Sequence, residues 1–92
     1  MHSIEIITLR AACGKKPDHR FMGLLAAERD IDDLKEVRVY FHADLDTDMS
    51  IHLHWQTDEP IRQRSTIGIR LAKLLKDYGL INHDLWIEEE RK

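Results

Sequence analysis

Two short segments that alternate strictly between apolar and polar residues limit the folds open to this chain. They are Val37–His42 and Ile51–Gln56, and each has the period of two that a β-strand with one buried face requires. The linking segment Asp44–Asp48 is rich in aspartate, whose side chain bonds to nearby backbone groups and favours turns. The sequence therefore predicts a β-hairpin with one apolar and one polar face.

The register of this hairpin follows from matching apolar with apolar residues across it, which places Ala43 opposite Met49. The apolar face then pairs Phe41 with Ile51, Val39 with Leu53 and Val37 with Trp55. The other face pairs His42 with Ser50, Tyr40 with His52 and Arg38 with His54. Directly opposed side chains are close neighbours, so these last six are predicted to form one polar patch.

Three further elements are predicted before and after the hairpin. A β-branched run holding Ile4, Ile6, Ile7 and Leu9 forms a strand that ends near Arg10. The segment Asp18–Arg29 is predicted to form a helix, because Phe21, Leu24 and Leu25 would then lie on one face of it. The alternating segment Ile81–Ile87 forms the last strand.

A second helix is predicted from about Ile61 to Tyr78, with one apolar stripe along it. Thr57 or Asp58 is expected to cap its start, where Pro60 is tolerated, and Gly79 suits a left-handed residue after its last turn. The stripe consists of Ile67, Leu71, Leu74, Leu75 and Tyr78.

The element order βαββαβ predicts a ferredoxin-like α+β fold. It has a four-stranded antiparallel sheet whose two right-handed crossovers place both helices on one face. A length of 92 residues without a Pro/Gly-rich linker predicts a single domain, 1–92. The uncovered face carries the polar patch, to which Trp86 of the last strand is also expected to contribute, so this face is the predicted functional surface.

Composition and charge exclude several classes of function. A formal net charge of −3 with scattered basic residues disfavours nucleic acid as a partner. No apolar run approaches the roughly 20 residues that cross a bilayer, and the start lacks signal-peptide features, so no membrane association and a cytoplasmic location are expected. The single Cys13 agrees with a reducing compartment and is interpreted as a loop cysteine, with a reactive thiolate beside Lys15 and Lys16 as the alternative.

In length, element order and polar uncovered sheet, the chain resembles the dimeric α+β barrel proteins, especially the antibiotic biosynthesis monooxygenase-like group. The segments Ser65–Ala72 and Tyr78–Trp86 carry the rest of the resemblance. It implies a homodimer in which two sheets meet with the helices outside and enclose a pocket in each protomer. It also implies a small-molecule ligand and, for some members, oxidation of aromatic compounds without a cofactor.

The first functional hypothesis is a monooxygenase-like enzyme without cofactor or metal. In it, His52 or His54 is the general base, Arg38 stabilises an oxyanion, and Tyr40 donates a hydrogen bond. His42, Ser50 and Trp86 are the candidate substrate-binding residues.

Three alternatives use the same surface. The His52-Leu53-His54 spacing, with His42 diagonally near, suits a divalent metal ion, although a catalytic site needs at least three well-placed ligands. A non-catalytic dimer would use the Tyr and Arg side chains as interface residues. RNA binding on the sheet would require stacked aromatic residues in a basic surround, and only Tyr40 is clearly available.

Overall fold

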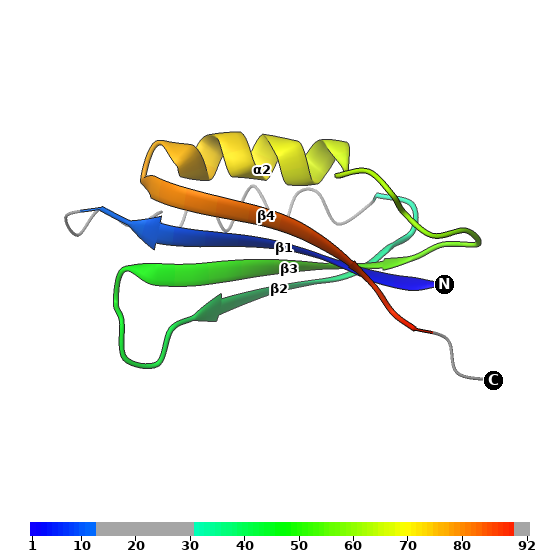
Figure 1. Cartoon of the computed structure of the whole chain (residues 1–92), viewed down its shortest axis with the longest axis horizontal. Coiled ribbons are helices and arrows are strands. Elements are labelled where there is room, and N and C mark those ends of the chain that lie inside the picture. The colour runs from blue at the N-terminus through cyan, green and yellow to red at the C-terminus, as the bar shows by residue number, and fades with distance from the viewer. Residues whose placement is uncertain (13–30, 90–92) are drawn as a thin grey trace.

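The computed structural model describes residues 1–12 and 31–89, which form an α+β protein. Its strands are β1 (His2–Ala11), β2 (Leu34–Phe41), β3 (Asp48–Gln56) and β4 (Gly79–Ile87), and its described helix is α2 (Thr66–Lys76). The strands make one sheet in the order β2-β3-β1-β4, with antiparallel neighbours throughout (Figure 1). The predicted helix over 18–29 and Cys13 lie outside the described residues.

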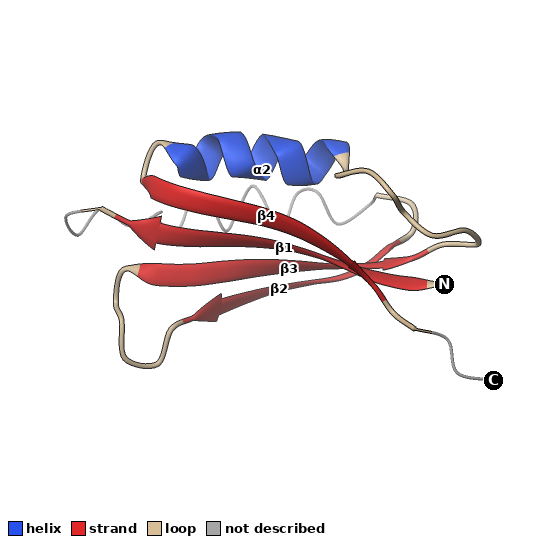
Figure 2. Ribbon diagram, viewed as in Figure 1, coloured by secondary structure: helices blue, strands red, loops and turns tan. Residues whose placement is uncertain are grey.

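Helix α2 lies along one face of the sheet, where it packs against β4 and β1 (Figure 2). Within the described residues, no helix is long and apolar enough to cross a membrane.

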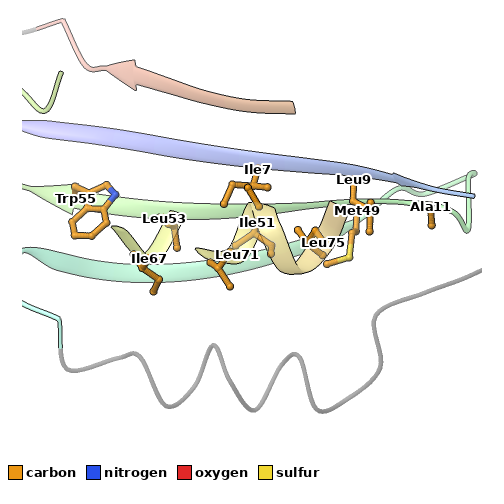
Figure 3. Packing of buried hydrophobic residues seen from close by; sticks show 11 residues of the cluster. Ile7, Leu9, Ala11, Met49, Ile51, Leu53, Trp55, Ile67, Leu71 and Leu75 are labelled. Atoms are coloured by element: carbon orange, nitrogen blue, oxygen red, sulfur yellow. The ribbon is translucent and has the colours of Figure 1, made fainter. Parts of the chain in front are cut away.

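The core lies between α2 and the odd-numbered side chains of the strands (Figure 3). Ile51, Leu53 and Trp55 of β3 are buried there as predicted, and three residues of the α2 stripe cover them. These are Ile67, Leu71 and Leu75. Phe41 was predicted to join this face in the core but is 68% exposed, because it ends the edge strand β2 while α2 packs over β1 and β4.

Both predicted ends of the second helix were wrong. The helix begins after Ser65, whose hydroxyl accepts a hydrogen bond from Gly68 N at 2.9 Å, and the Thr57 hydroxyl instead donates to the carbonyl of Glu59. Asp77 caps the other end in a right-handed conformation, and Gly79 already belongs to β4. Glycine is required there because an added Cβ would stand 2.1 Å from the carbonyl oxygen of Arg10.

The hairpin register also differs from the prediction, by two residues. Val39 pairs with Ile51 and Phe41 with Met49, so each side chain stays on its predicted face but meets a different partner. The cause is the turn, because His42 leaves the strand and its Nδ1 accepts hydrogen bonds at 3.0 Å from the backbone N–H groups of Asp44 and Leu45. This cap starts the turn before Ala43, which shortens β2 relative to the predicted pairing.

Candidate functional site

The sheet face opposite α2, called the open face below, carries the even-numbered side chains of all four strands. Rows of neighbours across it follow from the observed register. One row runs from Arg38 through His52 and Ile6 to Asp84, and the next from Tyr40 through Ser50 and Thr8 to Asn82.

His52 is the predicted site residue with the most contacts on this face. Its ring lies 4.6 Å from that of Tyr40, between centroids, and its Nε2 lies 3.2 Å from the Ser50 hydroxyl. Burial, and after it the positive charge that His54 can carry, lower the pKa of His52 below its ordinary value. The imidazole is therefore neutral near pH 7 and able to accept a proton.

His54 contacts His2, which is not among the candidate site residues of the sequence analysis. Its Nδ1 lies 3.3 Å from His2 Nε2, and the two rings are stacked with centroids 5.4 Å apart. His2 Nδ1 in turn lies 3.2 Å from a carboxylate oxygen of Glu88. Extending the predicted first strand to residue 2 would have placed His2 on this face, because its even-numbered position matches those of Ile4 and Ile6.

Arg38 contacts a neighbour on its own strand. Its Nε donates to Glu36 Oε1 at 2.6 Å, with both side chains about half exposed. Hydrogen bonding to Glu36, and after it to Tyr40, raises the pKa of Arg38 above its ordinary value, so the guanidinium is charged at any physiological pH. The predicted pairing of Arg38 with His54 was wrong, because the register places it opposite His52.

A half-open hollow of about 610 Å³ lies on the open face at the hairpin end of the sheet. This volume falls within the range of small-molecule sites. It is lined by three predicted site residues, which are Tyr40, His42 and Ser50. The other lining residues are Thr8, Arg10, Asp48, Leu80 and Asn82, together with their neighbours along the same strands. The structure thus brings three predicted site residues into one cavity, and Tyr40 and Ser50 connect this cavity to His52.

The other predicted residues do not line this hollow. Trp86 is 62% exposed and pairs with Ile4 in the row of His54, away from Leu80 and Asn82 of the same strand that do line it. Arg38, His52 and His54 are not among its lining residues either.

A metal site on this face lacks a third ligand in the structure. Across residues 1–12 and 31–89, no group of three or more His, Cys, Asp or Glu side chains is placed to hold a metal ion. Among the described residues, His42 does not join His52 and His54 in such a group, and its Nδ1 accepts hydrogen bonds within the turn.

The sequence interpretation missed a polar cluster beneath α2, centred on Glu5. This side chain is fully buried, and its carboxyl group contacts four groups from β3, β4 and the residue that caps α2. Trp55 Nε1 donates to Oε1 at 3.1 Å, and Ser65 donates from its hydroxyl at 2.6 Å and its backbone N–H at 3.1 Å. His83 Nε2 pairs with Oε2 in a buried contact.

The alternation of the first strand was the available signal for Glu5. The odd-numbered residues Ile7, Leu9 and Ala11 are apolar, whereas the even-numbered residues Thr8 and Arg10 are polar. Continued toward the N-terminus, this alternation places Glu5 and Ser3 on the buried face as well. The apolar Ile4 and Ile6 conceal this pattern because they lie on the open face. The cluster is enclosed in the core, so we interpret it as a structural feature that stabilises the packing of α2 on the sheet.

Comparison with known proteins adds no family to this description. No family model matches the chain, and no curated protein and no solved structure matches it either.

Proposed function

We propose that this protein is a homodimeric, cofactor-independent enzyme that removes a proton from a small aromatic or enolisable substrate bound at the open face. The observation that carries the proposal is His52, a neutral imidazole in contact with Tyr40 and Ser50, two residues that line the 610 Å³ hollow. A neutral imidazole can accept the proton of a phenol or enol near neutral pH.

The neighbours of His52 have separate roles in this proposal. The Ser50 hydroxyl fixes the imidazole orientation, and the Tyr40 hydroxyl donates to the oxygen on which negative charge develops. Arg38 acts through Tyr40, because its charge favours negative charge near that hydroxyl. The enolate or phenolate formed is the species that a monooxygenase-like reaction with O2 would consume, which is the reaction class suggested by the sequence resemblance.

The fold proposed for the whole chain is the ferredoxin-like βαββαβ arrangement, assembled as a dimeric α+β barrel. The antiparallel order β2-β3-β1-β4 supports it, as does the coverage of one sheet face by α2. The other sheet face is then available to a second copy.

In the proposed dimer, the two open faces are related by a two-fold axis that runs parallel to the strands between β3 and β1. Rotation about this axis places each row of one copy over the same row of the second copy, with the order of the strands reversed. Arg38 then faces Asp84 of the second copy, and His52 faces Ile6 of the second copy. Arg38 and Asp84 have opposite charges, and both are exposed in the single chain. Covering this face also removes from water Trp86 and Leu80, which are 62% and 76% exposed.

Light scattering tests the homodimer directly. We expect a dimer of the 10.9 kDa chain at concentrations of tens of micromolar near pH 8, and reversing the charge of Asp84 (Asp84→Lys) should weaken it. The double variant Arg38→Glu with Asp84→Lys restores opposite charges across the axis and should recover dimerisation. A monomeric wild-type chain would contradict the homodimer.

Replacing His52 with glutamine tests the catalytic role. A panel of small phenols and 1,3-dicarbonyl compounds is first screened for binding by amide chemical-shift changes and for oxygen consumption. For a compound that is turned over, His52→Gln should lower kcat/KM about 100-fold, since general-base catalysis contributes at least this much in typical enzymes. Lys73→Gln on the exposed side of α2 is the matched control.

The outcome that contradicts the catalytic role is an unchanged kcat/KM in His52→Gln. Binding without turnover for the whole panel favours the second candidate, a non-catalytic dimeric ligand-binding protein. The mutual packing of Tyr40 on His52 and of His2 on His54 is the observation that favours this candidate, because the rings stabilise one another without a substrate.

A further inference from the structure

The hollow on the open face contains an arginine, Arg10, that the proposed reaction does not use. Of the described residues that line the hollow, Arg10 alone carries a permanent positive charge and Asp48 alone a negative one. Arg10 lies in the middle of a row, with Asp48 of β3 on one side and Leu80 of β4 on the other. The row of Tyr40 separates it from the row of His52. The hollow therefore has a cationic group at the end away from the proposed base.

The guanidinium of Arg10 is loosely paired and accessible. Its Nε lies 3.5 Å from Asp48 Oδ2, whereas Arg38 on the same face donates to Glu36 at 2.6 Å. The Arg10 side chain is 71% exposed. In the described part of the chain, no hydrogen bond engages its two terminal nitrogens. Arg10 can therefore offer the N–H groups of these nitrogens to a ligand.

The carboxylate of Asp48 is far less available to a ligand. Its side chain is only 20% exposed. Oδ1 accepts a hydrogen bond from the Thr47 hydroxyl at 3.0 Å, and Oδ2 is the oxygen that faces Arg10. Both oxygens thus have a partner within the chain. Because the accessible charge in the hollow is the guanidinium, the hollow favours an anion over a cation.

Other lining groups add hydrogen-bond donors and an apolar surface. His42 Nδ1 accepts from the backbone N–H groups of Asp44 and Leu45, so the ring carries its proton on Nε2, which is a donor. His42 lines the hollow, as does the amide side chain of Asn82. Leu80 lines it as well and is 76% exposed, which gives a ring system an apolar surface to cover.

We propose that the hollow binds an aromatic or enolisable carboxylate, with its carboxylate group on Arg10 and its acidic proton directed toward His52. This substrate class deepens the proposed function and rests on it. A carboxylate matches the planar guanidinium, which can donate to both of its oxygens at once. His52 lies two rows from Arg10, which is about 13 Å along the strands. The ligand is therefore elongated, with the carboxylate and the acidic group at opposite ends of its ring system.

The proposed homodimer is compatible with this ligand. The two-fold axis places each row over the same row of the second copy, so the two hollows face each other. Asp48 of the second copy then lies across this space from Arg10. Because each Asp48 is already bonded within its own chain, it does not replace the carboxylate of a ligand.

Isothermal titration calorimetry with 6-hydroxy-2-naphthoate and its neutral carboxamide tests the role of Arg10. The first probe carries a phenol and a carboxylate at opposite ends of two fused rings, and near pH 8 its carboxylate is ionised. We expect the wild-type chain to bind the carboxylate at least about tenfold more tightly than the amide. Arg10→Gln should remove this preference by weakening the binding of the carboxylate alone. Arg62→Gln, which removes the same charge from an exposed position outside the hollow, is the matched control and should change neither Kd.

Asp48→Asn separates recognition of the ligand from a structural role of the Arg10–Asp48 pair. Asparagine keeps the shape of the side chain but removes the negative charge that competes for Arg10. The carboxylate should therefore bind about two- to fivefold more tightly to this variant. If the pair served only to hold the strands, both substitutions would weaken binding of both probes, and that result overturns the inference. Circular dichroism verifies that each variant is folded.

The outcomes distinguish this inference from the proposed function. Equal affinity of the wild-type chain for the two probes, or no binding of the carboxylate at millimolar concentration, overturns the inference. Unchanged binding of the carboxylate by Arg10→Gln overturns it too. Turnover of neutral compounds that depends on His52, without a preference for the carboxylate, defeats the inference and leaves the proposed function standing. Binding of the carboxylate that depends on Arg10 but gives no turnover supports the inference and counts against the catalytic role of His52.

Discussion

Replacing Glu5 with alanine is expected to lower the free energy of unfolding by about 3–5 kcal/mol, the range found when one partner of a buried, hydrogen-bonded pair is removed. The fully buried carboxyl group of Glu5 is the common partner of Trp55, Ser65 and His83. Its loss leaves an indole N–H, a hydroxyl and an imidazole in the core without their partner, and each such group adds a desolvation penalty. The hydrogen bonds that join the start of α2 to the sheet are lost at the same time.

Urea denaturation followed by circular dichroism measures this loss, and Glu5→Gln is the matched control. Glutamine keeps the shape and one carbonyl acceptor but presents an N–H₂ donor to groups that also donate, so an intermediate loss is expected. Thr8→Ala on the open face of the same strand should change the stability much less. A loss below about 1 kcal/mol for Glu5→Ala would mean that the cluster does not hold α2 on the sheet.

Replacing Gly68 with alanine is expected to destabilise the protein by about 1–3 kcal/mol, although alanine is the better helix former by up to about 1 kcal/mol. An added Cβ at Gly68 would stand 1.9 Å from Glu5 Oε2 and 2.6 Å from its Cδ. The Glu5 side chain could move only by leaving its bonds to Ser65 and His83. Steric overlap therefore outweighs helix propensity at this position.

A double-mutant cycle provides the decisive measurement for Gly68. In the Glu5→Ala background the overlapping atoms are gone, so Gly68→Ala should be neutral or stabilising by up to about 1 kcal/mol. The sign of the same substitution is thus expected to reverse between the two backgrounds. An equal loss in both would show that the close approach of Gly68 to Glu5 does not govern stability.

The sequence carried enough information to locate the strands of the hairpin but not their register. Alternation assigns faces, and every side chain of Val37–Phe41 lies on its predicted face. Apolar matching, however, is nearly as good after a slip of two residues, because such a slip preserves the faces. The ring of His42, which caps the turn, decided between the two registers, and turn caps by histidine have no clear sequence signature.

Side-chain partners distant in the sequence account for what else was missed. Glu5 is stable in the core only because residues near positions 55, 65 and 83 converge on it, and no local pattern reports that convergence. Likewise, His2 joins the histidines of the open face through its contact with His54, which is more than fifty residues away in the sequence. By contrast, the placement of Tyr40, Ser50 and His52 on one face of the hairpin was predictable, because alternation alone assigns faces.

The central place of β1 in the sheet has a kinetic consequence. Ile7 has Ile51 on one side and His83 on the other, so β1 is synthesised before either of its neighbours exists. Until β3 and β4 follow, both edges of an isoleucine-rich strand are unpaired and open to pairing with other chains. Correct assembly depends on contacts that are distant in sequence and slow to form, so the interval before β1 is enclosed is when this chain is most exposed to aggregation.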